Sequence, residues 1–373
     1  MRTYCVVVGS KSFFDKTVEE LFAKTKIDDT AVLSFLELIR ILDAQKQANI
    51  EEKVKTSLLL VRNTDYNGIV NEAHDRLGPL IEDITNDDAI IIVHNPPRVL
   101  YEYLQHSKSR GKIALLDDYK EQYCIKRDPS KFSSSISEIS NVIIGQDNAI
   151  YEISKSLWFL TTVQQKKPYV IMLYGNSSLG KTELAREIAK HFFDEKMFEK
   201  HLSMFKNNNY SDYFFGEEPN RRSIGFDLLE RTSNLIFLDE LDKCPDFFYS
   251  AFYTLFDNEI FKDATYDVDI SGAIIVLTSN YHNESEIKQN LGLPIFYRID
   301  KFIKFEDFSS DIIYRITKKE IESRREEYKE LLTSEQVYEV VSKRIGSKDE
   351  NARTIKYKIQ QVIEELLFCE IKK

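Results

Sequence analysis

The hydrophobic pattern divides the chain into two α/β regions joined by a polar stretch. In residues 1–128, short apolar runs alternate with segments whose apolar residues recur at helical spacing. Strands that alternate with helices predict a parallel, doubly wound sheet, so this region is expected to form a separate N-terminal α/β domain. The predicted strands are Tyr4–Val8, Ser57–Val61, Ala89–Val93 and Lys112–Leu116.

Polar residues follow each of these predicted strands, where the ligands of such sheets gather. They are Gly9-Ser10-Lys11, Asn63-Thr64-Asp65, His94-Asn95 and Asp117-Asp118. None of these groups forms a GxGxxG fingerprint. A small-molecule or nucleotide sensor and a hydrolase-like effector both remain open for this domain, but a docking module is favoured because fold predicts function poorly.

The pattern changes twice more along the chain. Residues 129–140 contain Pro129 and the Ser133-Ser134-Ser135 run without apolar periodicity, which predicts a linker. Residues 141–308 carry strongly apolar runs that predict central strands buried on both faces. Residues 309–373 show only helical spacing. The three apolar runs are Tyr169–Tyr174, Leu235–Leu238 and Ala273–Leu277.

A Walker A box, GxxxxGK[ST], follows the first of these runs and precedes a helical pattern. Gly175 and Gly180 permit the backbone geometry with which successive N–H groups surround phosphate oxygens. Lys181 supplies a charge for the β- and γ-phosphates, and Thr182 a hydroxyl for Mg²⁺. The cofactors predicted are ATP and Mg²⁺. The expected nucleotide contacts are Gly175, Asn176, Ser177, Ser178, Leu179, Gly180, Lys181, Thr182 and Glu183.

The other two apolar runs also end in polar residues. Asp239-Glu240 after the second run reads as a Walker B box, in which Asp239 holds Mg²⁺ and Glu240 polarises the attacking water. Asn280 near the end of the third run is a candidate for contact with the γ-phosphate or that water. Strands ending in solvated polar residues are the simpler alternative for Asn280.

The net charge and the absence of certain motifs exclude several classes of protein. The net charge of −10 and the pI of about 5.3 argue against broad nonspecific binding to nucleic acid. The sequence shows no CxxC pair, no HExxH pattern and no apolar run approaching the ~18 residues of a membrane span. Tyr4–Val8 is too short for the apolar part of a signal peptide. The expected protein is cytoplasmic, without a membrane partner.

From about residue 141 to residue 373 the chain resembles an AAA+ ATPase of the Clp branch, the heat-shock unfoldases. By this resemblance, residues 141–308 form the large P-loop subdomain and residues 309–373 the helical lid. Five motifs stand in the family's order. They are Val142–Asp147 (the "VIGQ" segment), Gly180–Ala185, Leu238–Lys243, Phe296–Asp300 (the "NRxD" box) and Asn351–Arg353 (the "GAR" motif, with Asn for Gly).

The resemblance implies roles for further residues. Ile143 and Ile144 would lie against the adenine. Arg298 would be the arginine finger that reaches the γ-phosphate of the neighbouring subunit, and Arg353 the sensor 2 arginine of the lid. Tyr213 and Phe214 stand where the family has its substrate-gripping pore loop. The leading glycine of that loop is missing, and aromatic residues are so abundant here that a core role for Phe214 is also open.

The resemblance further implies a homo-oligomeric ring, a hexamer, that hydrolyses ATP at subunit boundaries and remodels or unfolds protein. An alternative is an ATP-driven regulatory switch or assembly scaffold with the N-terminal domain as sensor or effector. A nucleic-acid remodeller would need a basic pore, which the excess of acidic over basic residues disfavours. No loop for docking a protease is identifiable.

Overall fold

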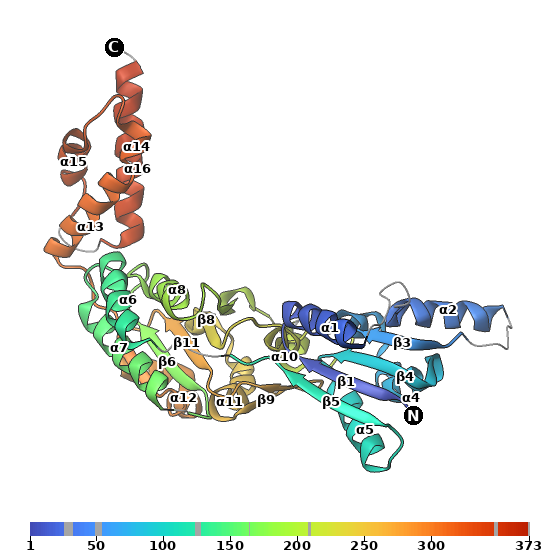
Figure 1. The fold of residues 1–373 in the computed structure, drawn as a ribbon. Coiled ribbons are helices and arrows are strands. Elements are labelled where there is room, and N and C mark those ends of the chain that lie inside the picture. Colours follow the sequence, from blue (N-terminus) through green and yellow to red (C-terminus); the bar gives the residue numbers. More distant parts are fainter. Residues whose placement is uncertain are drawn as a thin grey trace.

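A computed structural model describes residues 1–25, 33–48, 54–123, 128–163, 165–207, 210–346 and 350–371. Two five-stranded sheets and a group of helices follow one another along the molecule. Figure 1 shows the N-terminal sheet at one end, the C-terminal helices at the other and the second sheet between them. Every strand pair within the two large sheets is parallel, which confirms the predicted α/β class.

The N-terminal sheet has the strand order β2-β3-β4-β1-β5. Apolar residues alternate or run continuously in these strands, as expected for a sheet covered on both faces. The strands are β1 (Thr3–Val8), β2 (Leu33–Ser34), β3 (Thr56–Val61), β4 (Thr85–His94) and β5 (Leu115–Lys120).

Helices cover the two faces of this sheet unequally. α2 (Phe35–Gln47), α4 (Leu77–Ile84) and α5 (Arg98–Ser109) bury their apolar residues on one face, and α1 (Lys11–Thr25) packs on the other. The short elements η2 (Asn63–Gly68) and α3 (Asn71–His74) connect β3 to α4. The chain therefore leaves the adjacent strands β1 and β4 toward opposite faces, which makes their carboxyl ends a topological switch point.

The fifth strand differs from the prediction. It begins at Leu115 rather than Lys112 and runs through Asp117-Asp118 to Lys120. Among the residues that the structure describes, β5 pairs only with β1 and is an edge strand, so several of its side chains meet solvent and are polar. The residue at its carboxyl end is consequently Glu121, and the two aspartates lie within the strand.

The predicted linker, residues 129–140, is also corrected. These residues lie in α6 (Pro129–Val142), which begins with Pro at its first position behind the capping carboxylate of Asp128. The Phe132 ring lies 5.1 Å from Trp158 and 5.3 Å from Phe192, and Ile139 is buried. The exposed serines between these apolar residues disguise a helix that packs on the central region.

The central sheet has the strand order β12-β6-β11-β8-β7. Its three middle strands are almost wholly buried, as their continuous apolar runs predict. The strands are β6 (Tyr169–Tyr174), β7 (Phe198–His201), β8 (Leu235–Asp239), β11 (Ile274–Ser279) and β12 (Lys301–Lys304), with an antiparallel pair, β9 (Ile260–Lys262) and β10 (Asp267–Asp269), outside the sheet.

α7 (Asp147–Thr162) precedes the first of these strands. The helices and short turns between the strands are α8 (Lys181–Phe192), η3 (Leu202–Met204), α9 (Ser211–Phe215), α10 (Ile224–Leu229), η5 (Leu241–Lys243), η6 (Asp246–Phe248), α11 (Tyr249–Asp257) and α12 (Glu284–Phe296).

The C-terminal region is helical, as its periodicity predicts. α13 begins behind the capping hydroxyl of Ser309, and α15 behind a capping box of Thr333 and Gln336. Ile313, Val337 and residues of α16 form the shared core. The helices are α13 (Ser310–Ser323), α14 (Arg325–Tyr328), α15 (Ser334–Ser342) and α16 (Ala352–Ile371). Among the helices that the structure describes, none has the length and apolar character needed to cross a bilayer.

Candidate functional site

The loop between β6 and α8 has the backbone of a phosphate cradle. Gly175 has φ +132°, and a Cβ there would lie 2.4 Å from the carbonyl oxygen of Phe305. Gly180 has φ +105° and leads directly into α8. Ser178 also has a positive φ of 61°, which is costly for a residue with a Cβ. The two glycines that the motif specifies thus have positive φ, a Cβ is sterically excluded at Gly175, and the loop leads into the amino end of a helix, where phosphate groups bind.

The ammonium group of Lys181 points into this loop. Its Nζ donates to the carbonyl oxygens of Gly175 at 2.6 Å and Asn176 at 2.7 Å, and it lies 3.3 Å from Oδ1 of Asn280. Burial lowers the pKa of Lys181 to about 8, although the carboxylates of Asp242 and Asp239 act in the opposite direction. A buried cation whose hydrogen bonds within the described part of the chain go to carbonyl and amide oxygens is suited to bind the oxygens of an anionic ligand.

The Walker B carboxylate faces the first turn of α8. The hydroxyl oxygen of Thr182 lies 3.4 Å from both carboxylate oxygens of Asp239. A hydroxyl and a carboxylate that face each other are oxygen ligands of the kind that Mg²⁺ prefers. The residues present therefore fit an ATP–magnesium complex. Among the described residues, no group of three or more His, Cys, Asp or Glu side chains forms a separate metal site.

Glu240 stands immediately beyond Asp239 in a strained conformation. Its φ of 59° and ψ of 50° are left-handed, which is uncommon for a residue other than glycine. Its backbone N–H donates to Oγ1 of Thr278 at 2.9 Å, and the same hydroxyl donates a short hydrogen bond to Asp239. Thr278 thus positions both acidic residues of the Walker B box at once.

Sequence reasoning missed three residues of this site. Thr278 has a signal in the sequence, because it lies near the end of the strand next to Walker B, but the prediction names only Asn280 from that segment. Asp242 lies behind Lys181 and accepts from Nδ2 of Asn280 at 3.3 Å. His201 lies with Nδ1 3.2 Å from Asp239. His201 could not be found from the pattern, because its strand, Phe-Glu-Lys-His, has no apolar run.

The remaining predicted loop residues divide between packing and exposure. The side chain of Asn176 donates to Asp307 at 2.7 Å, and Leu179 is buried. Ser177 and Glu183 are exposed on the loop and on the first turn of α8. The loop therefore presents backbone and small polar groups on one side and is anchored on the other.

The segment before α7 lies between the phosphate loop and the helical region. Ile143 is buried, and its side chain is the nearest to the position of a Cβ on Gly180, at 3.7 Å. The side chain of Gln146 donates to the backbone oxygen of Glu306 at 2.9 Å and accepts from its N–H at 3.1 Å. These two bonds fix the segment against the end of β12.

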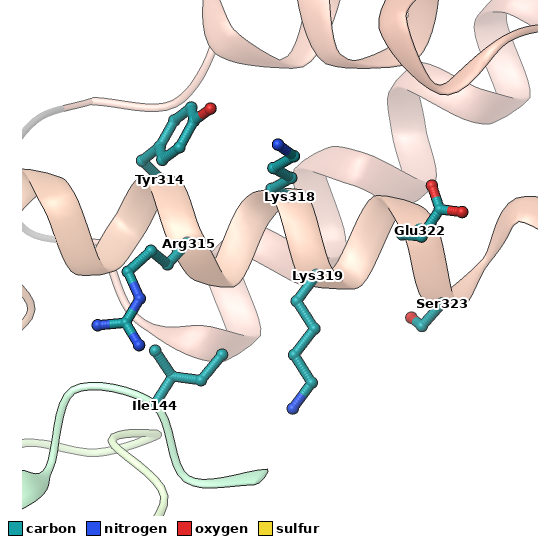
Figure 2. Close-up of a pocket in the computed structure, with 7 residues that line it drawn as sticks. All are labelled: Ile144, Tyr314, Arg315, Lys318, Lys319, Glu322 and Ser323. Atoms are coloured by element: carbon teal, nitrogen blue, oxygen red, sulfur yellow. The ribbon is translucent and has the colours of Figure 1, made fainter. Parts of the chain in front are cut away.

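Ile144, in the same segment, lines an open groove of about 590 Å³ against α13. Figure 2 shows Arg315 and Lys319 extending from α13 toward the segment that carries Ile144, whereas Tyr314 and Lys318 extend from the opposite side of the helix. Nζ of Lys319 donates to the backbone oxygen of Asn141 at 2.7 Å. The groove combines an apolar floor with cationic groups and has the size of a small-molecule site.

Arg353 lies at the start of α16, which contacts the phosphate loop directly. The backbone N–H of Ala352 donates to the carbonyl oxygen of Ser178 at 3.1 Å. Oδ1 of Asn351 caps the helix by accepting from the N–H groups of Arg353 and Thr354, both at 3.0 Å. Asn at this position thus supplies a cap. The side chain of Arg353 is exposed beside the loop.

Arg298 lies at the amino ends of the strands, whereas the phosphate loop lies at their carboxyl ends. Asp300, two residues later, exchanges hydrogen bonds with Val170, the second residue of β6, whereas Gly175 follows the last residue of that strand. A six-residue strand is roughly 20 Å long, so the side chain cannot reach the phosphate loop of its own chain. Nε of Arg298 lies 2.6 Å from Asp257, and the guanidinium lies over the Tyr253 ring.

The two residues of the predicted pore loop are packed rather than projecting. Phe214 is 1% exposed and contacts the rings of Phe205, Phe248 and Phe252. The hydroxyl of Tyr213 donates to Asp227 at 2.8 Å. Burial and the neighbouring Asp227 carboxylate raise the pKa of Tyr213. In this conformation Phe214 has the core role that was the alternative in the sequence.

Comparison with known proteins agrees with this geometry. The family model described as AAA domain (Cdc48 subfamily) matches residues 166–359. The chain is similar to the chaperone protein ClpB of Malacoplasma penetrans, with 22% identity over 71% of this chain and 44% of the relative. It is also similar to ClpC/MecB of Bacillus subtilis, a negative regulator of genetic competence, with 28% identity over 40% of this chain and 20% of the relative.

A solved structure shares the fold at low identity. The closed-state cryo-EM reconstruction of Hsp104 with ATPγS and FITC casein aligns with a TM-score of 0.56 and 14% identity, covering 99% of this chain and 89% of that chain. The chain spans less than half the length of the curated relatives named above. The likeness therefore concerns the fold and the ATPase module.

Proposed function

This chain belongs to the AAA domain family (Cdc48 subfamily) and is a Clp-type AAA+ ATPase, and from its site we propose that it hydrolyses ATP at the boundary between two copies of itself in a ring. Lys181 binds the β- and γ-phosphates. Thr182 and Asp239 would hold Mg²⁺, which would neutralise phosphate charge. Glu240 orients the attacking water, and Asn280 stands beside Lys181 where the γ-phosphate would lie.

The placement of Arg298 carries this proposal. The arginine is separated from its own phosphate loop by the length of β6, so it can act only on a nucleotide bound to another subunit. In the single chain it is held by Asp257 and Tyr253. Assembly would exchange these partners for the neighbouring γ-phosphate, where an arginine can contribute roughly 10³ to 10⁵ in rate, a range measured for GTPases.

Within one subunit, the lid would close over the nucleotide. Arg353 would contact the γ-phosphate from the start of α16, whose first residue already hydrogen-bonds the phosphate loop. The groove at Ile144, with Ile143 behind it, would receive the adenine end of the nucleotide. A change of phosphate charge on hydrolysis would then alter the position of the lid.

Substitution and mixing test the shared site. Glu240→Gln should bind ATP but hydrolyse little, and Arg298→Ala should bind ATP but lose most turnover. Mixed rings should regain activity. At the boundary between the two kinds of subunit, the Glu240→Gln subunit supplies an intact Arg298 and the Arg298→Ala subunit supplies an intact Glu240 to the same site. Arg325→Ala, which removes an exposed arginine paired with Glu322, is the matched control and should remain active. Normal turnover by Arg298→Ala, or by a highly dilute monomer, would refute the proposal.

We further propose that the work is applied to a protein substrate in the ring pore. The packing of Tyr213 and Phe214 instead favours a second candidate, an ATP-driven switch whose output is the N-terminal domain. Tyr210 and Met204 are exposed apolar side chains close to Tyr213 and Phe214 in the sequence. Their joint replacement by alanine should abolish unfolding of a fluorescent model protein but spare ATPase activity in an unfoldase. In an ATP-driven switch, this double substitution should leave the ATPase activity and the output of the N-terminal domain unchanged.

A further inference from the structure

The N-terminal domain has a crevice at the switch point between β1 and β4. Gly9 follows β1 and Asn95 follows β4, and the chain departs from these two strands toward opposite faces of the sheet. Open α/β sheets bind their ligands outside the carboxyl ends of the strands at such a point. The sequence offered no fingerprint for this crevice, but its geometry is specific.

A carboxylate from the central region fills this crevice. Glu230, directly after α10, extends its side chain between the two domains. Its Oε2 accepts from the backbone N–H of Lys11, the first residue of α1, at 3.0 Å. Its Oε1 accepts from Nδ2 of Asn63 at 2.9 Å and from Nδ2 of Asn95 at 3.3 Å. Nε2 of His94 lies 3.7 Å from the same oxygen.

The N-terminal domain holds these donors in place by its own contacts. Asn95 has a positive φ of 45°, and its side chain exchanges two hydrogen bonds of 2.9 Å with the backbone of Gly9. Nε2 of His94 lies 2.9 Å from the carbonyl oxygen of Gly9, and its ring stacks on Phe14. These contacts lie within the N-terminal domain, so His94 and Asn95 are held in place without Glu230.

Two further features suit the cradle to an anion. α1 has 15 residues, so its amino end presents a substantial positive dipole to whatever lies at Lys11. Asn63 is 1% exposed, and Oδ1 of the side chain that reaches Glu230 is buried without a hydrogen-bond partner among the described residues. A ligand with a hydroxyl or amine beside its anionic group would satisfy this oxygen, which the carboxylate of Glu230 cannot do.

We propose that the switch-point crevice is a binding site for a small organic anion bearing a carboxylate or phosphate group, and that Glu230 fills it as an internal competitor. A tethered carboxylate has a high effective concentration, so the external anion must outcompete it. A second inter-domain contact is independent of the crevice. Arg98 donates to Asp267 at 2.7 Å and to the backbone oxygen of Asp263 at 2.6 Å.

Anion-dependent stability of the full chain tests this site. Thermal unfolding is measured in sodium acetate and in inorganic phosphate, each against sodium chloride of equal ionic strength. Glu230→Ala should show a saturable rise in melting temperature of about 2–5 °C with at least one anion near ten times its dissociation constant. Acetate and phosphate distinguish the carboxylate from the phosphate class. The native chain should show a much smaller response at the same concentrations.

Two variants make the result decisive. Arg98→Ala weakens the domain contact without opening the crevice, so it should respond to the anions as the native chain does. Glu230→Gln keeps the volume of the side chain but removes the charge, and it should gain the anion response if Glu230→Ala does not fold. Responses to acetate and phosphate that match the chloride response in both Glu230 variants would overturn the proposal. So would an equal response in Arg98→Ala.

Discussion

The hydroxyl of Thr278 offers a sharp test of how the catalytic acids are positioned. Thr278→Val keeps the shape of the side chain but removes the oxygen that donates to Asp239 and accepts from the N–H of Glu240. Thr278 is buried, so water does not readily replace these bonds. Thr278→Ser is the matched control, because it retains the hydroxyl and loses only a methyl group.

The expected loss follows from the two bonds. A hydrogen bond to a charged group contributes about 1.5–3 kcal/mol, and a buried N–H left without a partner costs about 1–3 kcal/mol. Part of this total falls on the unreacted enzyme as lost stability. If about 1.4–2.8 kcal/mol falls on the transition state, kcat drops roughly 10- to 100-fold in Thr278→Val. Nucleotide affinity should fall less than kcat, because Lys181 and the phosphate loop keep their contacts and only the Asp239 side of the magnesium site is disturbed.

The assay compares kcat, nucleotide dissociation constant and melting temperature in the three proteins. Thr278→Ser should lose about 0.5–1.5 kcal/mol of stability through its missing methyl group, as other single-methyl deletions do, yet hydrolyse ATP at close to the native rate. Thr278→Val should be the slower enzyme whichever variant is less stable. Equal kcat values for the valine and serine variants would show that the hydroxyl does not position the acids.

The remaining predictions concern the lysine, the adenine segment and the aromatic core. Because burial lowers the pKa of free Lys181 to about 8 and bound phosphate must raise it, ATP binding should take up a proton near pH 8. ATP affinity should be constant below that pH and fall about tenfold per unit above it; calorimetry in two buffers checks this, with Lys181→Arg as the variant without uptake. Gly145→Ala should weaken ATP binding in equilibrium titrations, because its φ is +78° and the new Cβ would lie 2.5 Å from Ile312. Phe214→Ala should lower the free energy of unfolding by about 3–5 kcal/mol in urea titration, whereas Tyr210→Ala should change it little.

The strands and the phosphate loop could be predicted because their signals are local. The run Tyr169–Tyr174 is apolar since both faces of β6 are covered, and Gly175 is required because a Cβ there would strike Phe305. Both the apolar run and the glycine pattern can be recognised within a few consecutive residues. The same holds for the helix starting at Lys181.

Predictions failed where structure depends on distant residues. The edge position of β5 allows polar side chains, so the apolar signal placed this strand three residues too early. The sequence predicts a linker at α6, because the few apolar residues of this helix stand among serines and pack on Trp158 and Phe192, which lie far along the chain. His201 reaches Asp239 only because β7 pairs beside β8. No short window of sequence contains such a neighbour.

The position of Glu230 relative to the ATP site determines how the two sites can communicate. Glu230 lies in the turn before β8, which begins at Leu235, and Asp239 is the last residue of that strand. Arg231 fixes the turn between them, since it donates to the backbone oxygens of Leu228 at 2.8 Å and Asp269 at 2.6 Å and its guanidinium lies over the Tyr123 ring. The crevice therefore lies at the amino ends of the central strands and the phosphate loop at their carboxyl ends, so the length of a strand, roughly 15–20 Å, separates them. An anion in the crevice therefore cannot compete with ATP by direct contact, and β8 is the strand that joins the turn after Glu230 to Asp239.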